Sequence, residues 1–244
     1  MQTEKIILYL YRNNTGSTIL NEDFFQNFGC FAFLDCNVSE IGRPKGDNMI
    51  QESFYNGWLH KHGIKYQSVE APSGCCLTLF GPCSFRHSDL TLLDLSELTE
   101  ILDQCNETLI LDYGIEFYVY GDSIYRYHPH DCIKARYCEE PLTEQEILIN
   151  KIFGSVRVIV EWGFRETKLH WDLVSTMEKL RLFLSPLSKY YYIVATLLRN
   201  AYCCMYYNNS TQYFTPSSEE RLEHNITASC LPPTVDEYFR GNIA

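Results

Sequence analysis

Three acidic residues stand in sequence contexts where a free carboxylate is unfavourable. Asp35 interrupts the apolar run 31–38, Asp122 follows an apolar segment at a glycine, and Glu161 lies at the edge of an apolar helical stripe. A carboxylate among apolar neighbours is stabilised only when it is paired or binds a cation. If the two apolar segments are neighbouring strands and the helix packs over their ends, the three carboxylates converge. Converging carboxylates without Cys or His select Mg²⁺ or Mn²⁺, and two such ions serve phosphodiester chemistry.

Each of these acids also has a simpler use. Asp35 can accept a turn hydrogen bond at the end of a strand, and Asp122 can cap a turn or helix. Glu161 can pair with Arg157 or Arg165 on a solvated helix face, which is worth only about 0.5 kcal/mol. The residues alone leave both interpretations open at every position.

The elements that must position the acids follow from the pattern of apolar residues. The nearly continuous apolar run 31–38 predicts a central strand covered on both faces. Segments 63–70 and 75–80 predict a hairpin, and 116–122 predicts a further strand. Helical spacing predicts helices over 89–102, over 143–168 after a capping box at Thr143 and Glu146, and from 190 to about 206.

Composition limits the class of protein and its partners. The chain has 244 residues, and no apolar run approaches the roughly 20 residues that cross a bilayer, so we expect a soluble, intracellular chain. The net charge of −11 opposes a broad electrostatic hold on DNA, which then requires a local basic patch or a partner. The 11 cysteines include no CxxC pair, so we expect reduced, mostly buried thiols.

Two further groups of residues have a functional and a plain interpretation. His128 and His130 with Cys132 suggest zinc, but their spacing is poor and favours a polar loop. Five basic residues could form a positive patch beside the acids that is suited to phosphate: Arg43, Lys45, Lys61, Lys65 and Arg86. The alternative is ordinary surface charge, which the negative net charge of the chain favours.

Ordered motifs from about Phe33 to Tyr206 resemble one known family, the DDE endonuclease domain of PIF/Harbinger-type transposases. The resemblance rests on Asp35-Cys36-Asn37, Arg43-Pro44-Lys45-Gly46-Asp47-Asn48, Phe54-Tyr55-Asn56-Gly57, His62-Gly63-Ile64-Lys65-Tyr66-Gln67, Gly81-Pro82, His87-Ser88-Asp89, Gly121-Asp122-Ser123-Ile124-Tyr125 and Arg157-Val158-Ile159-Val160-Glu161. Because all three acids fall within matching motifs, the resemblance favours the metal site over the simpler uses.

The resemblance implies an α/β, ribonuclease H-like fold with a five-stranded mixed sheet of order 3-2-1-4-5 flanked by helices. It implies that Asp35, Asp122 and Glu161 form a D-D-E triad holding two Mg²⁺ or Mn²⁺ ions, with Asp89 as an additional candidate ligand. In that family the metals serve hydrolysis of a DNA strand at a transposon end, and the freed 3′-hydroxyl then attacks target DNA. The expected partner is therefore DNA in the nucleus, and a separate DNA-binding protein and a second copy of the chain are further candidates.

The departures from the family pattern support a second hypothesis. Gln51-Glu52 replaces the usual Gln-Arg, and Trp58-Leu59 replaces His-Lys after the glycine. These changes suit a domesticated or degenerate copy that serves as a DNA- or protein-interaction module without catalysis. The expected organisation is an N-terminal lead-in over 1–29 that resembles a truncated helical region, the endonuclease domain over 30–206, and a polar tail over 207–244.

Overall fold

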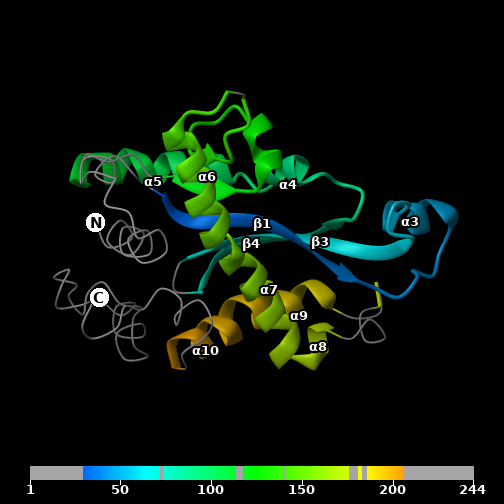
Figure 1. Ribbon diagram of the computed structural model, residues 1–244. Coiled ribbons are helices and arrows are strands. Elements are labelled where there is room, and N and C mark those ends of the chain that lie inside the picture. The colour runs from blue at the N-terminus through cyan, green and yellow to red at the C-terminus, as the bar shows by residue number, and fades with distance from the viewer. Residues whose placement is uncertain are drawn as a thin grey trace.

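The computed structural model describes residues 30–71, 74–113, 118–139, 141–175, 181–182 and 186–205. The expected lead-in over 1–29 and tail over 207–244 lie outside these residues, so the domain boundaries stay predictions. Within the described residues, a central sheet lies between two layers of helices (Figure 1). None of the described helices combines the length and the apolar character that crossing a bilayer requires.

The sheet is mixed and is built around one long apolar strand, β1 (Cys30–Glu40). Strand β3 (Lys61–Glu70) pairs antiparallel with β1 and with β4 (Cys76–Ser84), which confirms the predicted hairpin. On its other side β1 pairs in parallel with β5 (Tyr118–Gly121), which pairs in parallel with β6 (Ile133–Lys134). The short β2 (Tyr55–Asn56) pairs with the start of β3. The expectation of a mixed sheet flanked by helices is confirmed.

One face of the sheet is covered by α4 (Asp89–Leu95) and α5 (Leu98–Tyr113). Apolar side chains from β1, β5, β6 and both helices form a buried core there, which includes Leu34, Leu93, Val119 and Cys132. Burial of this apolar surface is the main force that holds the helices on the sheet. The 3₁₀ helix η1 (Ser123–Tyr127) contributes the fully buried Tyr125 to the same core.

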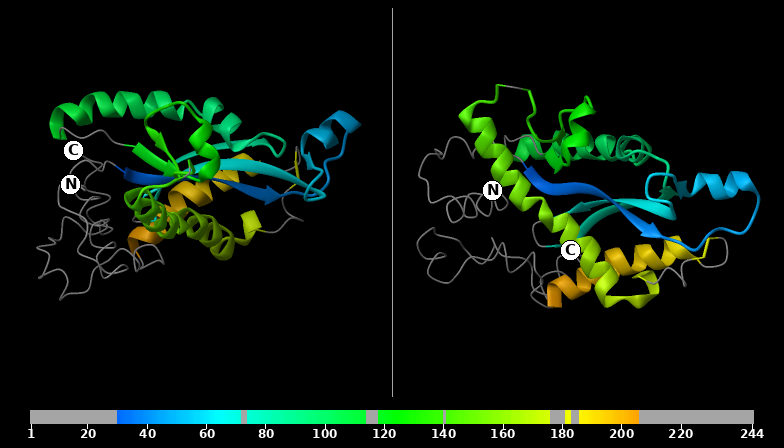
Figure 2. Two further views of the ribbon diagram at one scale, coloured as in Figure 1. Left: turned by 45° about the horizontal axis from the view of Figure 1, so that its top comes forward. Right: turned by 45° about the vertical axis from the view of Figure 1, so that its right-hand side comes forward.

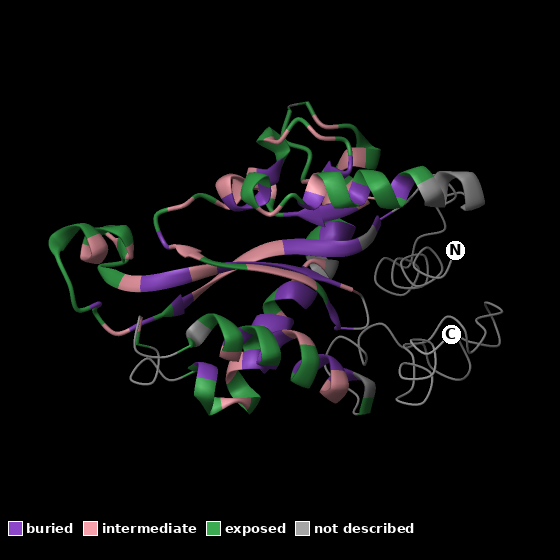
Figure 3. Ribbon diagram, turned by 180° about the vertical axis from the view of Figure 1, so that it is seen from behind, coloured by how far each residue is buried: buried purple, intermediate pink, exposed green. Residues whose placement is uncertain are grey.

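The opposite face is covered by the C-terminal helices. These are α7 (Val158–His170), α8 (Asp172–Ser175), α9 (Leu187–Tyr192), the π-helical segment η2 (Ile193–Leu198) and α10 (Arg199–Met205). A second core joins α8, α9 and η2 to the sheet, and in it the rings of Tyr66 and Tyr191 stack with centroids 4.0 Å apart. Seen from behind, burial concentrates in the strands and in the helix faces that meet them (Figure 3).

Two predicted helices are each divided in two. The helix expected over 89–102 breaks at Ser96, which ends α4, and at Glu97, which has a positive φ of 52°. The helix expected over 143–168 becomes α6 (Glu144–Val156) and α7, which meet at Arg157 and continue nearly as one rod (Figure 2, right). The capping box predicted at Thr143 and Glu146 is present. Helix α3 (Asn48–Ser53), which the sequence did not predict, protrudes beyond the far end of the sheet (Figure 1).

A buried ion pair links the second helix layer to the sheet. Arg199 on α10 donates a hydrogen bond to Glu70 at the end of β3, and each side chain is only 1% exposed. Ser68 donates to the other oxygen of the Glu70 carboxylate at 2.5 Å. Gly163 on α7 leaves the space for this pair, since a Cβ there would lie 2.3 Å from Nη1 of Arg199.

A register irregularity in β1 decides which residues of β5 lie beside it. The pairing shifts between Cys30 and Ala32, after which Phe33 pairs with Tyr120 and Leu34 with Gly121.

Most of the described cysteines are buried, and the structure records no disulfide among the described residues, as the composition predicts.

Candidate metal-binding active site

Asp35 lies at the centre of the candidate site, in the middle of β1. Its side chain is 18% exposed, and its Oδ1 accepts a hydrogen bond from the backbone N–H of Cys36 at 2.7 Å. Because Leu34 pairs with Gly121 in the parallel ladder, Asp35 lies beside Asp122, which directly follows the last residue of β5. Two acids 87 positions apart in the printed numbering therefore meet at the carboxyl end of β5.

The pKa of Asp35 reflects both its burial and the charges of its neighbours. Burial raises the pKa of Asp35 from 3.8 to about 6, while the Cys36 N–H and the Arg157 guanidinium oppose the rise. The charges of Asp122 and Asp89 raise this pKa further. A buried carboxylate that faces two more negative charges is a position where a bound cation would relieve both desolvation and repulsion.

Arg157 connects Asp35 to Glu161. Its Nη1 donates to Oδ2 of Asp35 at 2.8 Å, and its Nη2 donates to Oε1 of Glu161 at 3.1 Å. Glu161 lies one turn along α7, and its side chain is 55% exposed. The pairing of Glu161 with Arg157 that the sequence offers as an alternative is present, and the same guanidinium brings Glu161 to the Asp35 side of the helix.

Asp122 and Asp89 each begin a helix beside the site. Asp122 is exposed and caps η1 by accepting from the backbone N–H of Ser123 at 2.6 Å, so its predicted capping role is present too. Asp89 is the first residue of α4, and its Oδ1 accepts from Nζ of Lys65 at 2.8 Å. Both carboxylates still act on Asp35, as its pKa shows.

A pocket of about 610 Å³ opens beside Asp35 and Glu161. Two cationic side chains of α7, Arg165 and Lys168, line it with Asn37. Nζ of Lys168 donates to Oδ1 of Asn37 at 3.1 Å and to the carbonyl of Val38 at 2.9 Å. Burial lowers the pKa of this lysine, and the nearby Glu40 opposes the shift.

The sequence reasoning missed Lys168 and the contact of Arg157 with Asp35. Helical spacing could have indicated both, because positions 157, 161, 165 and 168 recur at intervals of four and three and share one face of a helix. The fold is still needed to show that this face meets β1.

The five predicted DNA-binding residues are distributed over several elements. Lys65 contacts Asp89, Lys61 pairs with Glu40 at 2.5 Å, and Arg43 donates to Oε1 of Gln51. Lys45 and Arg86 are exposed. Of these five, Lys65 is the one whose ion pair links it to an acid of the site.

Among the described residues, the carboxylate oxygens of Asp35, Asp122 and Glu161 do not all lie within 4.8 Å of one another, the separation at which three side chains could share one metal ion. The group Asp103, His130 and Cys132 does meet this distance. Arg157 lies between Asp35 and Glu161 and occupies the place of a counter-ion. The donor set nevertheless fits Mg²⁺ or Mn²⁺, because the acids offer hard oxygen ligands around a desolvated carboxylate.

Comparison with known proteins identifies the family. A family model described as DDE superfamily endonuclease matches residues 34–200. The chain belongs to the DDE superfamily endonucleases. Searches of curated proteins and of solved structures found no match.

Membership in the DDE superfamily agrees with the family resemblance read from the motifs, at the level of the superfamily. The matched range contains Asp35, Asp122 and Glu161, and it ends beside the buried Arg199. As a nuclease family, the DDE endonucleases imply a DNA substrate. The match covers both the sheet and the helix layer that carries Glu161.

Proposed function

We propose that the chain is a divalent-metal-dependent DNA endonuclease, the catalytic domain of a transposase, in which Asp35, Asp122 and Glu161 are the metal ligands. The observation that carries the proposal is the place of Asp35 at the edge of a pocket, next to Asp122 and linked to Glu161 through Arg157. Burial and the charges of Asp122 and Asp89, which raise the pKa of Asp35, support it. One cation, Arg157, is shared between Asp35 and Glu161, and the charges of Asp122 and Asp89 act on the same half-buried acid at the edge of a pocket.

Mg²⁺ or Mn²⁺, as one or two ions, would be held by Asp35 and Asp122 with Glu161 completing the set, and Asp89 is the additional candidate ligand. When bound, the metal supplies Lewis-acid activation of the attacking oxygen and stabilises the leaving oxygen of the phosphodiester. Binding of a metal ion would require Arg157 to release Asp35, since Nη1 of Arg157 now donates a hydrogen bond to Oδ2 of Asp35.

The protein's own residues would bind and orient the DNA strand. Arg165 and Lys168 line the pocket on the Glu161 side and present positive charge to a phosphate. Arg157, once freed from Asp35, remains within reach of Glu161 and can hold that carboxylate in place. Of the predicted basic residues, Lys65 is the best candidate for a further phosphate contact, because its Nζ already donates to the carboxylate of Asp89 beside the site. Arg43, Lys45, Lys61 and Arg86 remain proposals for contacts farther along the DNA.

The finer classification belongs to the same proposal. The path β4-β3-β1-β5-β6, with one antiparallel hairpin and two parallel neighbours, supports the ribonuclease H-like class. The ordered motifs support the PIF/Harbinger subtype, strand transfer by the freed 3′-hydroxyl, and action on DNA in the nucleus.

Two measurements on the full chain test the proposal. Millimolar Mn²⁺ or Mg²⁺ is expected to raise the melting temperature and to support nicking of supercoiled plasmid DNA. Asp35→Asn and Asp122→Asn should each remove the thermal shift and lower nicking at least a hundredfold. Glu144→Gln is the matched control, because Glu144 is an exposed acid on α6 away from the pocket. Metal-dependent nicking that persists in Asp122→Asn would refute the assignment.

A second candidate function is favoured by the contact of Arg157 with both Asp35 and Glu161, which gives each acid a cationic partner without a metal. In this case the chain is a domesticated or degenerate module that binds DNA or protein without catalysis. It predicts no thermal shift with Mn²⁺ or Mg²⁺ and no nicking, with plasmid binding retained in a gel-shift assay.

A further inference from the structure

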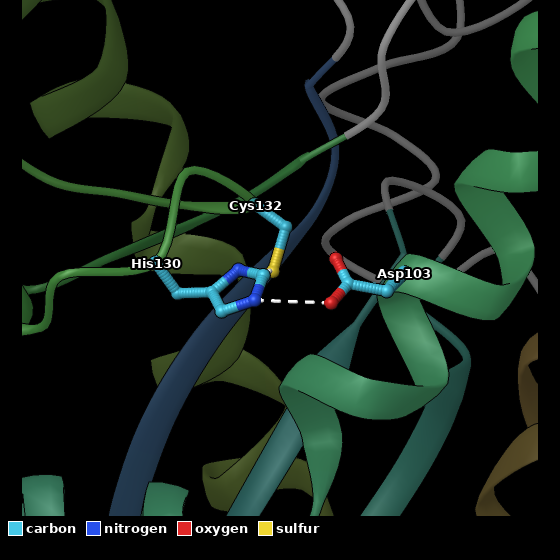
Figure 4. A group of neighbouring side chains, drawn as sticks. All are labelled: Asp103, His130 and Cys132. Carbon is cyan, nitrogen blue, oxygen red and sulfur yellow. Dashed lines mark hydrogen bonds and ion pairs between the residues drawn. The ribbon is translucent and has the colours of Figure 1, made fainter.

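A second group of metal-binding side chains lies on the opposite side of the sheet from Glu161. Asp103 projects from α5, and His130 and Cys132 lie in the loop that leads into β6 (Figure 4). One ligand atom from each residue lies within 4.8 Å of the other two. Asp103 precedes His130 by 27 positions and Cys132 by 29, so the fold, and not local spacing, brings its carboxylate to the other two side chains.

The imidazole of His130 lies between the other two groups. Its Nε2 lies 3.0 Å from Oδ2 of Asp103, and its Nδ1 lies 3.0 Å from Sγ of Cys132. The donors are thus one oxygen, one nitrogen and one sulfur. This mixed set suits zinc, whereas Mg²⁺ takes oxygen ligands, so the two candidate sites of the molecule differ in the metal that they select.

The three residues differ in exposure in a way that suits ion entry. Cys132 is 1% exposed and belongs to the core beneath α4 and α5, so its sulfur is fixed in place. The side chains of His130 and Asp103 are 35% and 52% exposed, so an ion can reach the group from solvent.

Neighbouring acids make the surroundings favourable for a cation. Nε2 of His128 lies 3.4 Å from Oδ1 of Asp94, and its Nδ1 accepts from the backbone N–H of His130 at 3.3 Å, which orients the loop. The pKa of the exposed Glu100 is lowered, chiefly by local hydrogen bonds, with smaller contributions from His130 and His128. Three carboxylates of α4 and α5 therefore face the two histidines.

We propose that Asp103, His130 and Cys132 bind Zn²⁺ as an accessory site, separate from the acid pocket. Zinc bonds are about 2.3 Å to sulfur and about 2.0 Å to nitrogen, so ligand atoms around one ion lie roughly 3.3–3.7 Å apart. The 3.0 Å contact between Nδ1 of His130 and Sγ of Cys132 would therefore lengthen slightly as the ion enters. On binding, the Cys132 thiol releases its proton to solvent and the sulfur forms the bond to zinc, while a water molecule completes the coordination. Because the carbonyl of Cys132 accepts from the N–H of Val119, the ion would fasten α5 to the β5–β6 region.

The test uses Co²⁺ and Zn²⁺ alone as probes of the full chain. Bound Co²⁺ should give a thiolate-to-cobalt charge-transfer absorption in the near ultraviolet, and an equimolar amount of Zn²⁺ should abolish it. Cys132→Ser should remove the absorption, and His130→Gln and Asp103→Asn should each weaken Zn²⁺ binding at least tenfold. Cys105→Ser is the matched control, since Cys105 is an exposed thiol on α5 two residues from Asp103.

Two outcomes would overturn the inference. One is a charge-transfer band that survives Cys132→Ser but disappears in Cys105→Ser. The other is a Zn²⁺ affinity that changes less than twofold in Asp103→Asn, a variant whose altered side chain is half exposed and which therefore decides the question even if Cys132→Ser does not fold. Asp122→Asn should keep full Zn²⁺ affinity, so failure of the acid pocket and failure of this site can be told apart.

Discussion

Two arginine–carboxylate groups link the sheet to the same helix layer, yet their surroundings differ. Arg199 and Glu70 are each 1% exposed, and both oxygens of the Glu70 carboxylate accept hydrogen bonds from within the core. Arg157 lies between Asp35 and Glu161 at the mouth of a pocket, with the charges of Asp122 and Asp89 close by.

The difference separates a structural charge from a functional one. A closed pair that loses one partner leaves a buried charge unpaired, and solvent has no access to compensate it. An open group with surplus negative charge is a poor stabiliser of the fold and a good binder of cations. The two groups therefore predict opposite responses to the same kind of substitution.

The largest effect is expected at the closed pair. Glu70→Gln leaves the guanidinium of Arg199 without its carboxylate, so the free energy of unfolding should fall by about 3–5 kcal/mol. Urea denaturation followed by circular dichroism measures the change. Glu161→Gln, the same substitution at the open group, should change stability by less than about 1 kcal/mol. Equal losses in the two variants would contradict the comparison.

A smaller effect of opposite sign is expected at Asp35 in the absence of metal. Because the folded state raises the pKa of Asp35 to about 6, the folded protein holds a proton that the unfolded chain has lost between pH 4 and pH 6. The stability that this group contributes is therefore present at low pH and disappears as pH rises through about 6. Asp35→Asn should raise the free energy of unfolding by roughly 1–2 kcal/mol at pH 7.5 and by little at pH 4.

Urea titrations of both proteins at the two pH values, with EDTA present, provide the measurement. A destabilised Asp35→Asn at pH 7.5 would show that the acid is held as firmly as Glu70 and would remove the distinction between the groups.

The smallest effect is expected from removing the cation of the open group. Arg157→Gln should cost less than about 1 kcal/mol, because Glu161 stays hydrated and Asp35, whose pKa is already raised, can take up a proton instead of keeping an unpaired charge. The clearer effect of this substitution should be a further rise in the pKa of Asp35, since the charge of Arg157 opposes that rise in the wild-type chain. The midpoint of the pH dependence of Mn²⁺ binding should move upward by up to about one pH unit. A downward shift would contradict the role assigned to Arg157.

The sequence predicted the sheet well because its signals are local. The apolar run 31–38, the hairpin over 63–80 and the segment ending at Asp122 correspond to β1, β3, β4 and β5. The divisions of the helices were not predictable, because the apolar spacing continues through Glu97, where φ is positive, and through Arg157, where α6 ends and α7 begins. The short β2 and β6 depend on pairing with distant strands, which no local pattern records.

The candidate sites divide in the same way. The family motifs were enough to select Asp35, Asp122 and Glu161, and the fold brings Asp122 beside Asp35 and links Glu161 to it through Arg157. Spacing argued against zinc at His130 and Cys132 because the third candidate ligand, Asp103, lies on a helix that precedes them by 27 positions. Only the packing of α5 on the β6 region makes that group visible.

The register shift between Cys30 and Ala32 has a consequence for how insertions and deletions would act on this chain. Strand side chains alternate between the two faces, so losing one residue from β1 upstream of Asp35 would either exchange its faces or slide it along β5. In the first case the carboxylate would enter the core with Leu93 and Val119, and in the second Asp122 would face a different neighbour. Length changes at the start of β1 would therefore separate the acids of the pocket while every acidic residue remained in the sequence.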